Sequence, residues 1–400
     1  MKAVAKTVET RIAQVEKAFE TIVAQDVLSL EELALLTARQ LRKQFGLVDI
    51  ANQNQTVKQV SAMLDSGLPS WAASLRGAAL EHRRLSGKEQ GIFGGIILDK
   101  KLREKIKAQF SVDYPWSASK INNYGLCPFR FFAGNVLNLS LVEEPTEGFG
   151  ANRLGSAYHE ILEKTFSKLK EQGIELTADS IEQATEIAEA ICEASLQNLL
   201  DKREIRKSGL WDFDKSEIKK RVVNLLRLEV LANDQKAATP LLFEQRFGFG
   251  NKPPLIIQHE EGDIKIRGSI DRIDKTVDGL VVIDYKTSRS PIGAKEALEG
   301  RNLQLPIYLM AANRALKQDE PVSAGFYLHI HSCKKGSEFP SKSLEIKDIT
   351  AKAEEYIGDY VSKVRHAEFP VAPNQGRCPP YCEFDVMCRI QSLCTTTDDE

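Results

Sequence analysis

An acid and a lysine stand two residues apart at the end of a run with strong β character, Val281–Ser288. Because side chains alternate along a strand, Asp284 and Lys286 share one face, with only Tyr285 between them. A carboxylate beside an ammonium group at a strand end is suited to metal-dependent hydrolysis. These residues fit an ordinary solvated hairpin equally well, so the chemical interpretation depends on what else reaches this face.

A hairpin is expected to bring a second acid to the same face. The Asp-Gly pair at 278–279, between two β runs, predicts a two-residue type I′ turn. In the resulting register Lys286 faces Asp271, and Asp284 becomes a diagonal neighbour of Asp271, about 5–8 Å away at the backbone. Two carboxylates at that distance can hold one hard cation. A slip of one residue would bring Asp274 to this face in place of Asp271.

Four further residues carry groups able to do chemistry, although each has an ordinary structural explanation when taken alone. His159 is expected early in a helix, where most lone histidines are packed or solvated. Gln304 and Tyr308 stand four residues apart and therefore share one face of a predicted helix. Glu244 is an acid on a predicted strand, where a side chain that faces solvent is usual.

The cysteines near the C-terminus form another candidate site. Cys378, Cys382 and Cys388 fall within eleven residues, and Cys394 follows closely. The prolines after Cys378 favour a tight knuckle over a helix. Thiolates at such spacing bind zinc or an iron–sulfur centre, and spacing alone does not separate the two. The fourth ligand would be Cys394 or the distant Cys127, which stands beside a proline in an aromatic segment.

The 400-residue chain has the composition of a soluble globular protein, with 42% hydrophobic and 28% charged residues. Its net charge of −2 gives no global basic signature, so a nucleic-acid contact would depend on local patches. No apolar stretch is long enough to span a bilayer, and the first residues lack the apolar core of a signal peptide. We therefore expect a cytoplasmic protein with no membrane partner, in which clustered cysteines indicate metal or cluster binding more than disulfides.

The elements that must position these residues change along the chain. Residues 1–112 show mainly helical spacing of apolar residues and are expected to form a helical N-terminal region. Residues 113–394 are expected to form an α/β domain, in which residues 155–231 are mainly helical with Gly155 and Gly173 as breaks. The other expected elements of this domain are strands Leu241–Phe249, Leu255–His259, Ile264–Ile273, Leu280–Tyr285 and Ser323–Ile330, and helices Asn302–Leu316 and 350–366.

The order of these residues resembles a known family. The matching set is Gly155-x-x-x-His159, Gly268-x-x-Asp271-x-x-Asp274, Asp284-Tyr285-Lys286-Thr287 and Gln304-x-x-x-Tyr308, and it resembles the RecB-like branch of the PD-(D/E)xK nuclease superfamily. The segment from Cys127 to Phe132 and the C-terminal cysteines narrow the resemblance to the nuclease domain of the B subunit of bacterial ATP-dependent helicase–nucleases, the AddB type. The resemblance implies a restriction-endonuclease-like core, in which helices flank a mixed central sheet, and residues 1–112 would then be the remnant of a helicase-like domain.

The resemblance implies a metal-dependent deoxyribonuclease, an exonuclease acting on single-stranded DNA ends in double-strand break repair and recombination. As ligands of Mg²⁺ or Mn²⁺ it assigns His159, Asp271, Asp284 and the Tyr285 carbonyl. Lys286 would position the attacking water and offset charge on the reacting phosphate, while Gln304 and Tyr308 would orient the lysine or the DNA backbone. Glu244 would hold a water molecule or a second cation.

The resemblance also implies a second cofactor and a partner. Cys127, Cys378, Cys382 and Cys388 would hold a 4Fe–4S cluster that fixes the C-terminal tail to the nuclease domain. Three residues separate the first two cysteines of the tail where the family usually has two, so Cys394 stays a reserve ligand. The chain has no GxxxxGK[ST] loop, and a helicase–nuclease subunit of the A type would supply ATP-driven unwinding.

The alternatives are a non-catalytic relative of this fold that binds nucleic acid, and a zinc-knuckle scaffold with an incidental hairpin. The intact Asp271, Asp284 and Lys286 argue against a non-catalytic relative, since such relatives tend to lose these groups. A scaffold would leave the joint presence of His159 and Gln304 at the expected places unexplained.

Overall fold

The computed structural model describes residues 95–141, 147–233, 238–288, 292–316, 320–341, 344–374, 378 and 382–388. The chain divides into two compact units, Met1–Gly94 and Gly95–Glu400, and the described residues all belong to the second. The predicted helices before residue 95 lie outside the described residues. The helical N-terminal region and its boundary at residue 112 therefore stay predictions, and so does any role of Cys394.

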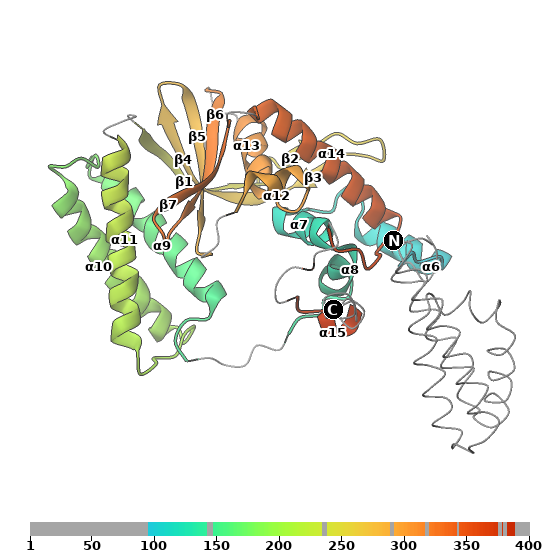
Figure 1. Ribbon diagram of the computed structural model, residues 1–400, viewed down its shortest axis with the longest axis horizontal. Helices are drawn as coiled ribbons and strands as arrows, with labels where there is room; N and C mark the ends of the chain where they lie inside the picture. The colour runs from blue at the N-terminus through green and yellow to red at the C-terminus, as the bar shows by residue number, and fades with distance from the viewer. Residues whose placement is uncertain are drawn as a thin grey trace, which may run out of the picture. The chain divides into compact units, whose positions relative to one another are not determined.

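In the second unit a run of helices comes before strands β1–β5, and two helices then separate these strands from β6 and β7 (Figure 1). In chain order its elements are α6 (Lys100–Gln109), α7 (Ala118–Leu126), α8 (Pro128–Phe131), the π-helix η2 (Phe132–Val136), α9 (Ala151–Glu171), α10 (Ile181–Asp201), α11 (Trp211–Asn233), β1 (Thr239–Phe247), β2 (Leu255–Ile257), β3 (Ile264–Ile266), β4 (Gly268–Thr276), β5 (Gly279–Lys286), α12 (Ala294–Leu298), α13 (Gln304–Arg314), β6 (Val322–His329), β7 (Lys334–Phe339), α14 (Ile346–Arg365) and α15 (Asp385–Cys388). None of the described helices is long and apolar enough to cross a membrane.

The central sheet has five strands in the order β1-β4-β5-β6-β7. β4 runs antiparallel to β1 and β5, β5 runs parallel to β6, and β6 runs antiparallel to β7. Parallel neighbours need a crossover connection, and α12 and α13 supply it between β5 and β6. β2 and β3 form a separate two-stranded sheet. The predicted α/β class, a mixed central sheet flanked by helices, is confirmed.

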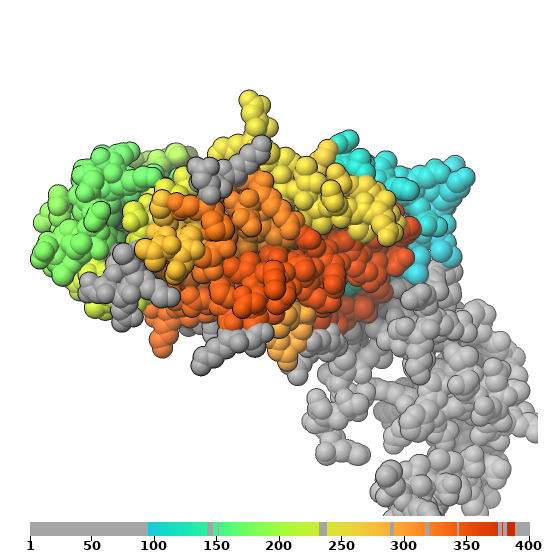
Figure 2. Space-filling model, turned by 90° about the horizontal axis from the view of Figure 1, so that it is seen from above, coloured from blue at the N-terminus to red at the C-terminus, as the bar shows by residue number. Residues whose placement is uncertain are grey.

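Helices cover both faces of the central sheet, so the sheet separates two hydrophobic cores. One core contains side chains from α9, α10 and α11, and the other contains side chains from α6, α7, α13 and α14. Figure 2 shows the green residues of α10 at one end of this unit and the cyan residues of α6 at the other, with yellow and orange residues between them.

β5 shows how the sequence produces these layers. Leu280 and Val282 pack into the core shared with α13 and α14, whereas Ile283 and Tyr285 pack into the core shared with α9–α11. A strand buried on both faces has a nearly continuous apolar sequence, and fully burying each such side chain contributes about 1.5–3 kcal/mol. The polar residues at the end of β5 therefore stand on a rigid base.

The helical region expected between residues 155 and 231 is confirmed as three helices, α9, α10 and α11. Gly173 follows the C-cap of α9 with φ of +65°, a left-handed conformation that favours glycine at a helix end. The expected break at Gly155 is wrong, because α9 begins at Ala151 and runs through that position. His159 is consequently the ninth residue of α9.

The β4–β5 hairpin differs from the predicted register by two residues. Thr276 pairs with Gly279, so the turn consists of residues 277–278, one position earlier than predicted. Gly279 has φ of +126°, and its carbonyl accepts from the Thr276 hydroxyl at 2.8 Å. A shift of two preserves the alternation of side chains, so the acids keep a common face. The observed register, continued by one position, places Asp271 directly opposite Asp284 and not diagonal to it.

The predicted strand Ile264–Ile273 is two strands, β3 and β4. The chain leaves one ladder and enters another at Arg267, whose amide donates to the Trp116 carbonyl at 2.9 Å. β3 then pairs with β2, and β4 pairs with β1 and β5. This division places the start of β4 beside β1, which carries Glu244.

Candidate active site

Asp271 and Asp284 meet on adjacent strands in the interior of the sheet. Their side chains are nearly buried, with 9% and 1% of their surface exposed. The Tyr285 amide donates to Asp271 Oδ2 at 2.8 Å, so the strand that carries one acid also fixes the other. Two desolvated carboxylates on neighbouring strands repel each other, and such a pair is stabilised by a nearby cation.

Lys286 supplies one such cation from the protein's own groups. Its Nζ lies 2.5 Å from Asp284 Oδ2 and donates to Gln304 Oε1 at 2.7 Å. Gln304 Nε2 donates in turn to Asp284 Oδ1 at 2.9 Å and to the Tyr308 hydroxyl at 3.1 Å. The helix face predicted from Gln304 and Tyr308 therefore meets the strand face predicted from Asp284 and Lys286.

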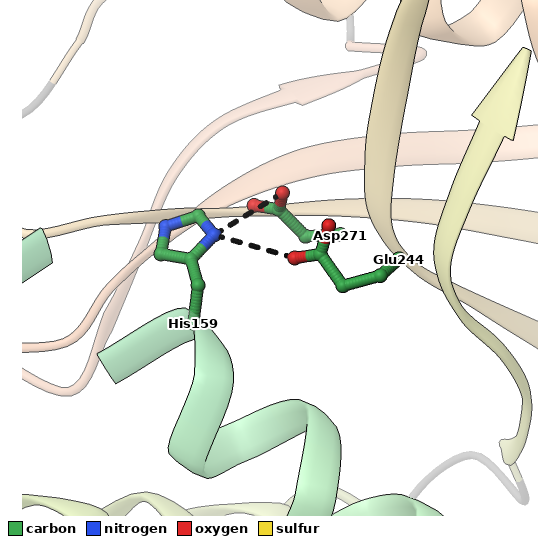
Figure 3. Close-up of side chains that lie close together, drawn as sticks. All are labelled: His159, Glu244 and Asp271. Carbon is green, nitrogen blue, oxygen red and sulfur yellow. Dashed lines mark ion pairs between the residues drawn. The ribbon is translucent and has the colours of Figure 1, made fainter. Parts of the chain in front are cut away.

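His159 approaches the neighbouring strands β1 and β4 from α9 (Figure 3). Its Nδ1 lies 3.3 Å from Asp271 Oδ1 and 3.7 Å from Glu244 Oε1. The Ser269 hydroxyl donates to the other oxygen of Glu244 at 2.9 Å. Among the described residues, His159, Glu244 and Asp271 offer three ligand atoms within 4.8 Å of one another, close enough to hold one cation.

Glu244 occupies a strained position in β1, since its φ is +43° although it is neither glycine nor asparagine. At this point the side chains of β1 change the face of the sheet to which they point. Phe243 stacks on Phe166 in the core of α9–α11, whereas Phe247 packs into the core of α13 and α14. A strained backbone of this kind costs on the order of 1–3 kcal/mol and is found disproportionately at functional sites. Here it turns the Glu244 carboxylate toward His159.

Asp274, the residue that a one-residue slip would bring to the site, lies on the opposite face of the sheet. Both of its oxygens accept from Arg272, at 2.6 Å from Nε and 2.6 Å from Nη2. The same guanidinium binds both carboxylate oxygens of Glu229 on α11 at 3.0 Å. Asp274 is therefore part of a structural network, and the alternative register is wrong.

Burial and neighbouring charges shift the pKa values of Asp284 and His159. Burial raises the pKa of Asp284 to about 6; Lys286 opposes this shift, and Asp271 adds to it. Burial lowers the pKa of His159, but the carboxylates of Asp271 and Glu244 outweigh it and raise that pKa to about 10. Without a metal, His159 is therefore a cation at neutral pH, and a metal ion that binds there displaces its proton.

The donor set fits a divalent metal. Asp284 Oδ2 is buried without a hydrogen bond of good geometry, although it forms the ion pair with Lys286. Carboxylate oxygens suit Mg²⁺ and Mn²⁺, and an imidazole nitrogen suits Mn²⁺ better than Mg²⁺. His159 and Asp271 are brought together as predicted, and Glu244 joins them more closely than its predicted accessory role suggested. The Tyr285 carbonyl as a ligand stays a prediction.

Comparison with known proteins agrees with this geometry. Residues 115–389 match the family model described as the PD-(D/E)XK nuclease superfamily. The chain belongs to this superfamily. Members of this superfamily use divalent metals, in agreement with the group of His159, Glu244 and Asp271 in this chain.

The similar proteins are B subunits of larger enzymes. Three relatives, each named as the B subunit of an ATP-dependent helicase/deoxyribonuclease, come from Leuconostoc citreum, Oceanobacillus iheyensis and Clostridioides difficile. They are 27% identical over 240 residues, 26% over 273 and 28% over 238, which is 57%, 63% and 56% of this chain. The matches cover 20%, 23% and 19% of the relatives, so the nuclease-family chain spans about a fifth of their length.

The four predicted cluster cysteines are all described, and no disulfide joins them. Cys127 is buried between α7 and α8; burial raises the pKa of its thiol, and Cys382 adds to that increase. The Phe384 ring lies 3.4 Å from the place where a Cβ on Gly134 of η2 would be, and Figure 1 shows α15 beside α8. The tail thus lies next to the upstream cysteine, and the cluster itself stays a prediction.

Sequence reasoning missed Asn302, which organises the start of α13. Its Oδ1 accepts from the Gln304 amide at 3.2 Å, the Tyr327 hydroxyl at 3.3 Å and Asn122 Nδ2 at 3.3 Å. Asn122 Oδ1 accepts from the Leu303 amide at 2.8 Å. These bonds fix the backbone from which Gln304 reaches Lys286. An asparagine at the first position of the predicted helix Asn302–Leu316 was the available signal, because asparagine is favoured at helix starts.

His159→Gln is expected to change how the stability of the metal-free protein depends on pH. Because the folded pKa of His159 is raised from 6.5 to about 10, its stabilising contribution is complete below about pH 6.5 and is lost as the pH rises toward 10. The wild type should therefore lose stability relative to His159→Gln over that interval, measured as urea midpoints in EDTA. His366 is an exposed histidine outside the site, so His366→Gln should show the pH dependence of the wild type. If the urea midpoints of His159→Gln and the wild type changed in parallel with pH, the raised pKa of His159 would be contradicted.

Proposed function

We propose that this chain is a divalent-metal-dependent deoxyribonuclease that hydrolyses phosphodiester bonds at DNA ends, as an exonuclease in double-strand break repair and recombination. The observation that supports this best is the opposed pair Asp271 and Asp284, with Lys286 held against Asp284 by Gln304. A DNA substrate and a helicase subunit as partner agree with the names of the relatives.

Each residue has a role that follows from its contacts. The metal would be held by Asp271, Asp284 and His159, with Glu244 and the Tyr285 carbonyl as further ligands. When bound, a divalent cation polarises the phosphate and lowers the pKa of bound water. Gln304 accepts from Lys286 and so keeps its ammonium group at the acids, where it can orient a water and stabilise charge that develops on the phosphate.

The test is cleavage of end-labelled single-stranded and double-stranded DNA by the purified chain, with Mg²⁺, Mn²⁺ or EDTA. We expect metal-dependent release of short products from DNA ends, and no release in EDTA. Asp271→Asn should be inactive, because it removes the charge of the carboxylate shared by the Tyr285 amide and His159. Cleavage that persists in EDTA, or cleavage of circular DNA at the rate of linear DNA, would contradict a metal-dependent exonuclease.

We further propose that Cys127, Cys378, Cys382 and Cys388 hold a 4Fe–4S cluster that joins the tail to the nuclease domain. Cys127→Ser is expected to lower the iron content and visible absorption of anaerobically purified protein, because it removes the one ligand distant from the others in sequence. Cys333→Ser, in the turn after β6, serves as the matched control and should keep both. If the wild-type protein were colourless and contained stoichiometric zinc, the four cysteines would form a zinc knuckle and not an iron–sulfur cluster.

A further inference from the structure

A pocket of about 520 Å³ opens beside His159 and Glu244. The residues that line it are Gly155, Ser156, His159, Glu160, Glu163, Glu244 and Arg246. Three carboxylates give this opening a negative field, which opposes the approach of a polyanion such as DNA. Among the lining residues, Arg246 is the one whose side chain is a permanent cation.

The position of Arg246 is fixed by the same ladder that fixes Glu244. It stands two residues further along β1 and pairs with Ser269, whose hydroxyl donates to Glu244. Both side chains therefore line the pocket from one strand. Across it, burial raises the pKa of Glu163, the nearby acids Glu244 and Glu160 add to the increase, and Arg246 opposes it.

Arg246 differs from the other cations around the site in having no ion pair or hydrogen bond from its side chain to any described residue. Lys286 is bound to Asp284 and Gln304, and Lys164 is bound to Glu160. Arg246 is also exposed. A phosphate can therefore bind its guanidinium without breaking an existing pair, and the planar fork of an arginine suits two phosphate oxygens.

We propose that Arg246 binds a backbone phosphate of the DNA strand that enters this pocket, next to the bond that is cut. This rests on the proposed nuclease function for the identity of the substrate. The guanidinium offsets the three carboxylates at the opening and positions the strand, while the groups at Asp271, Asp284 and Lys286 act on the neighbouring phosphodiester.

The test compares Arg246→Gln and Arg246→Lys with the wild type on an end-labelled single-stranded oligonucleotide at saturating Mg²⁺. Arg246→Gln is expected to raise KM about tenfold, the value of one charge-assisted contact of about 1.4 kcal/mol, with kcat changed less than about threefold. Arg246→Lys keeps the charge but loses the planar guanidinium, so its KM should lie between those of the wild type and Arg246→Gln. Arg103→Gln, an exposed arginine on α6, is the matched control and should match the wild type.

A second measurement separates this proposal from the nuclease assignment. The affinity for the same oligonucleotide is measured by fluorescence anisotropy in EDTA at several salt concentrations. One lost phosphate contact lowers the slope of log affinity against log salt by about 0.7 for a single strand. If the wild type binds but does not cleave, a reduced slope in Arg246→Gln still supports the phosphate site. An unchanged slope and KM, or a fall in kcat alone, would overturn it.

Discussion

Asp284→Asn is expected to abolish cleavage while the fold survives. The carboxylate is 1% exposed, and its Oδ1 accepts from Gln304 at 2.9 Å, a bond that an amide oxygen can keep. The substitution removes the negative charge with which, under the proposed function, Asp284 would help to hold a divalent cation. A metal that stabilises the transition state by several kcal/mol accounts for a rate loss of about 10³-fold or more.

The stability of the same variant gives an independent check. Burial raises the pKa of Asp284 to about 6, so the ionised form is disfavoured in the folded protein compared with the unfolded chain. Removing the charge should therefore not lower the urea midpoint at neutral pH, even though Lys286 loses its ion pair and keeps its hydrogen bond to Gln304. Asp278→Asn, in the turn of the same hairpin, is the matched control and should keep both rate and midpoint. A single-turnover rate within tenfold of the wild type for Asp284→Asn would remove Asp284 from the active site.

The hairpin shows how a prediction can place side chains on the correct face of a strand and still fail in the register. The sequence placed Asp271, Asp284 and Lys286 on one face because side chains alternate, and any even shift preserves that alternation. The turn itself was misplaced, because Gly279 uses its positive φ at the first position of β5 and not inside the loop. The acids were therefore predicted on one face but two residues apart along the strands, whereas they lie directly opposite each other.

The group around Glu244 could not have been derived from local pattern. An acid on a strand usually faces solvent, and only a backbone with positive φ turns this one toward α9. The partner, His159, is 85 residues earlier on a helix whose start was misplaced. Contacts of this kind depend on how a helix packs on a sheet, and that packing cannot be predicted from the spacing of residues or from their secondary-structure propensities. The same is true of Asn122, which reaches Asn302 across 180 residues.

Arg272 separates the acid of the candidate site, Asp271, from the structural acid of β4, Asp274. Asp271 on one side of it meets Asp284, and Asp274 on the other side is held by the guanidinium itself. The same group binds Glu229, donates to the Tyr285 hydroxyl at 3.3 Å and lies 4.3 Å from the centre of the Phe166 ring. All its donors are used within a buried environment, so α9, α11, β4 and β5 meet at one side chain.

Arg272→Met is therefore expected to destabilise the protein more than any other single change considered. It leaves Asp274 and Glu229 as buried or nearly buried carboxylates without a cation, and breaking a buried ion pair from one side typically costs about 3–5 kcal/mol. Urea unfolding should show a large fall in midpoint. Arg267→Met, which removes only an arginine stacked on the exposed ring of Phe249, should cost about 0.5–1 kcal/mol.

A second substitution shows whether the loss comes from the unpaired charges. Adding Asp274→Leu to Arg272→Met removes one stranded carboxylate and should recover part of the stability, because apolar replacement of buried charges is often neutral or favourable. If the double variant were less stable than Arg272→Met, packing around Phe166 and Tyr285 would be the main contribution of the arginine. Recovery would instead show that Arg272 chiefly neutralises acids, which leaves Asp271 as the one aspartate of β4 free to serve the site.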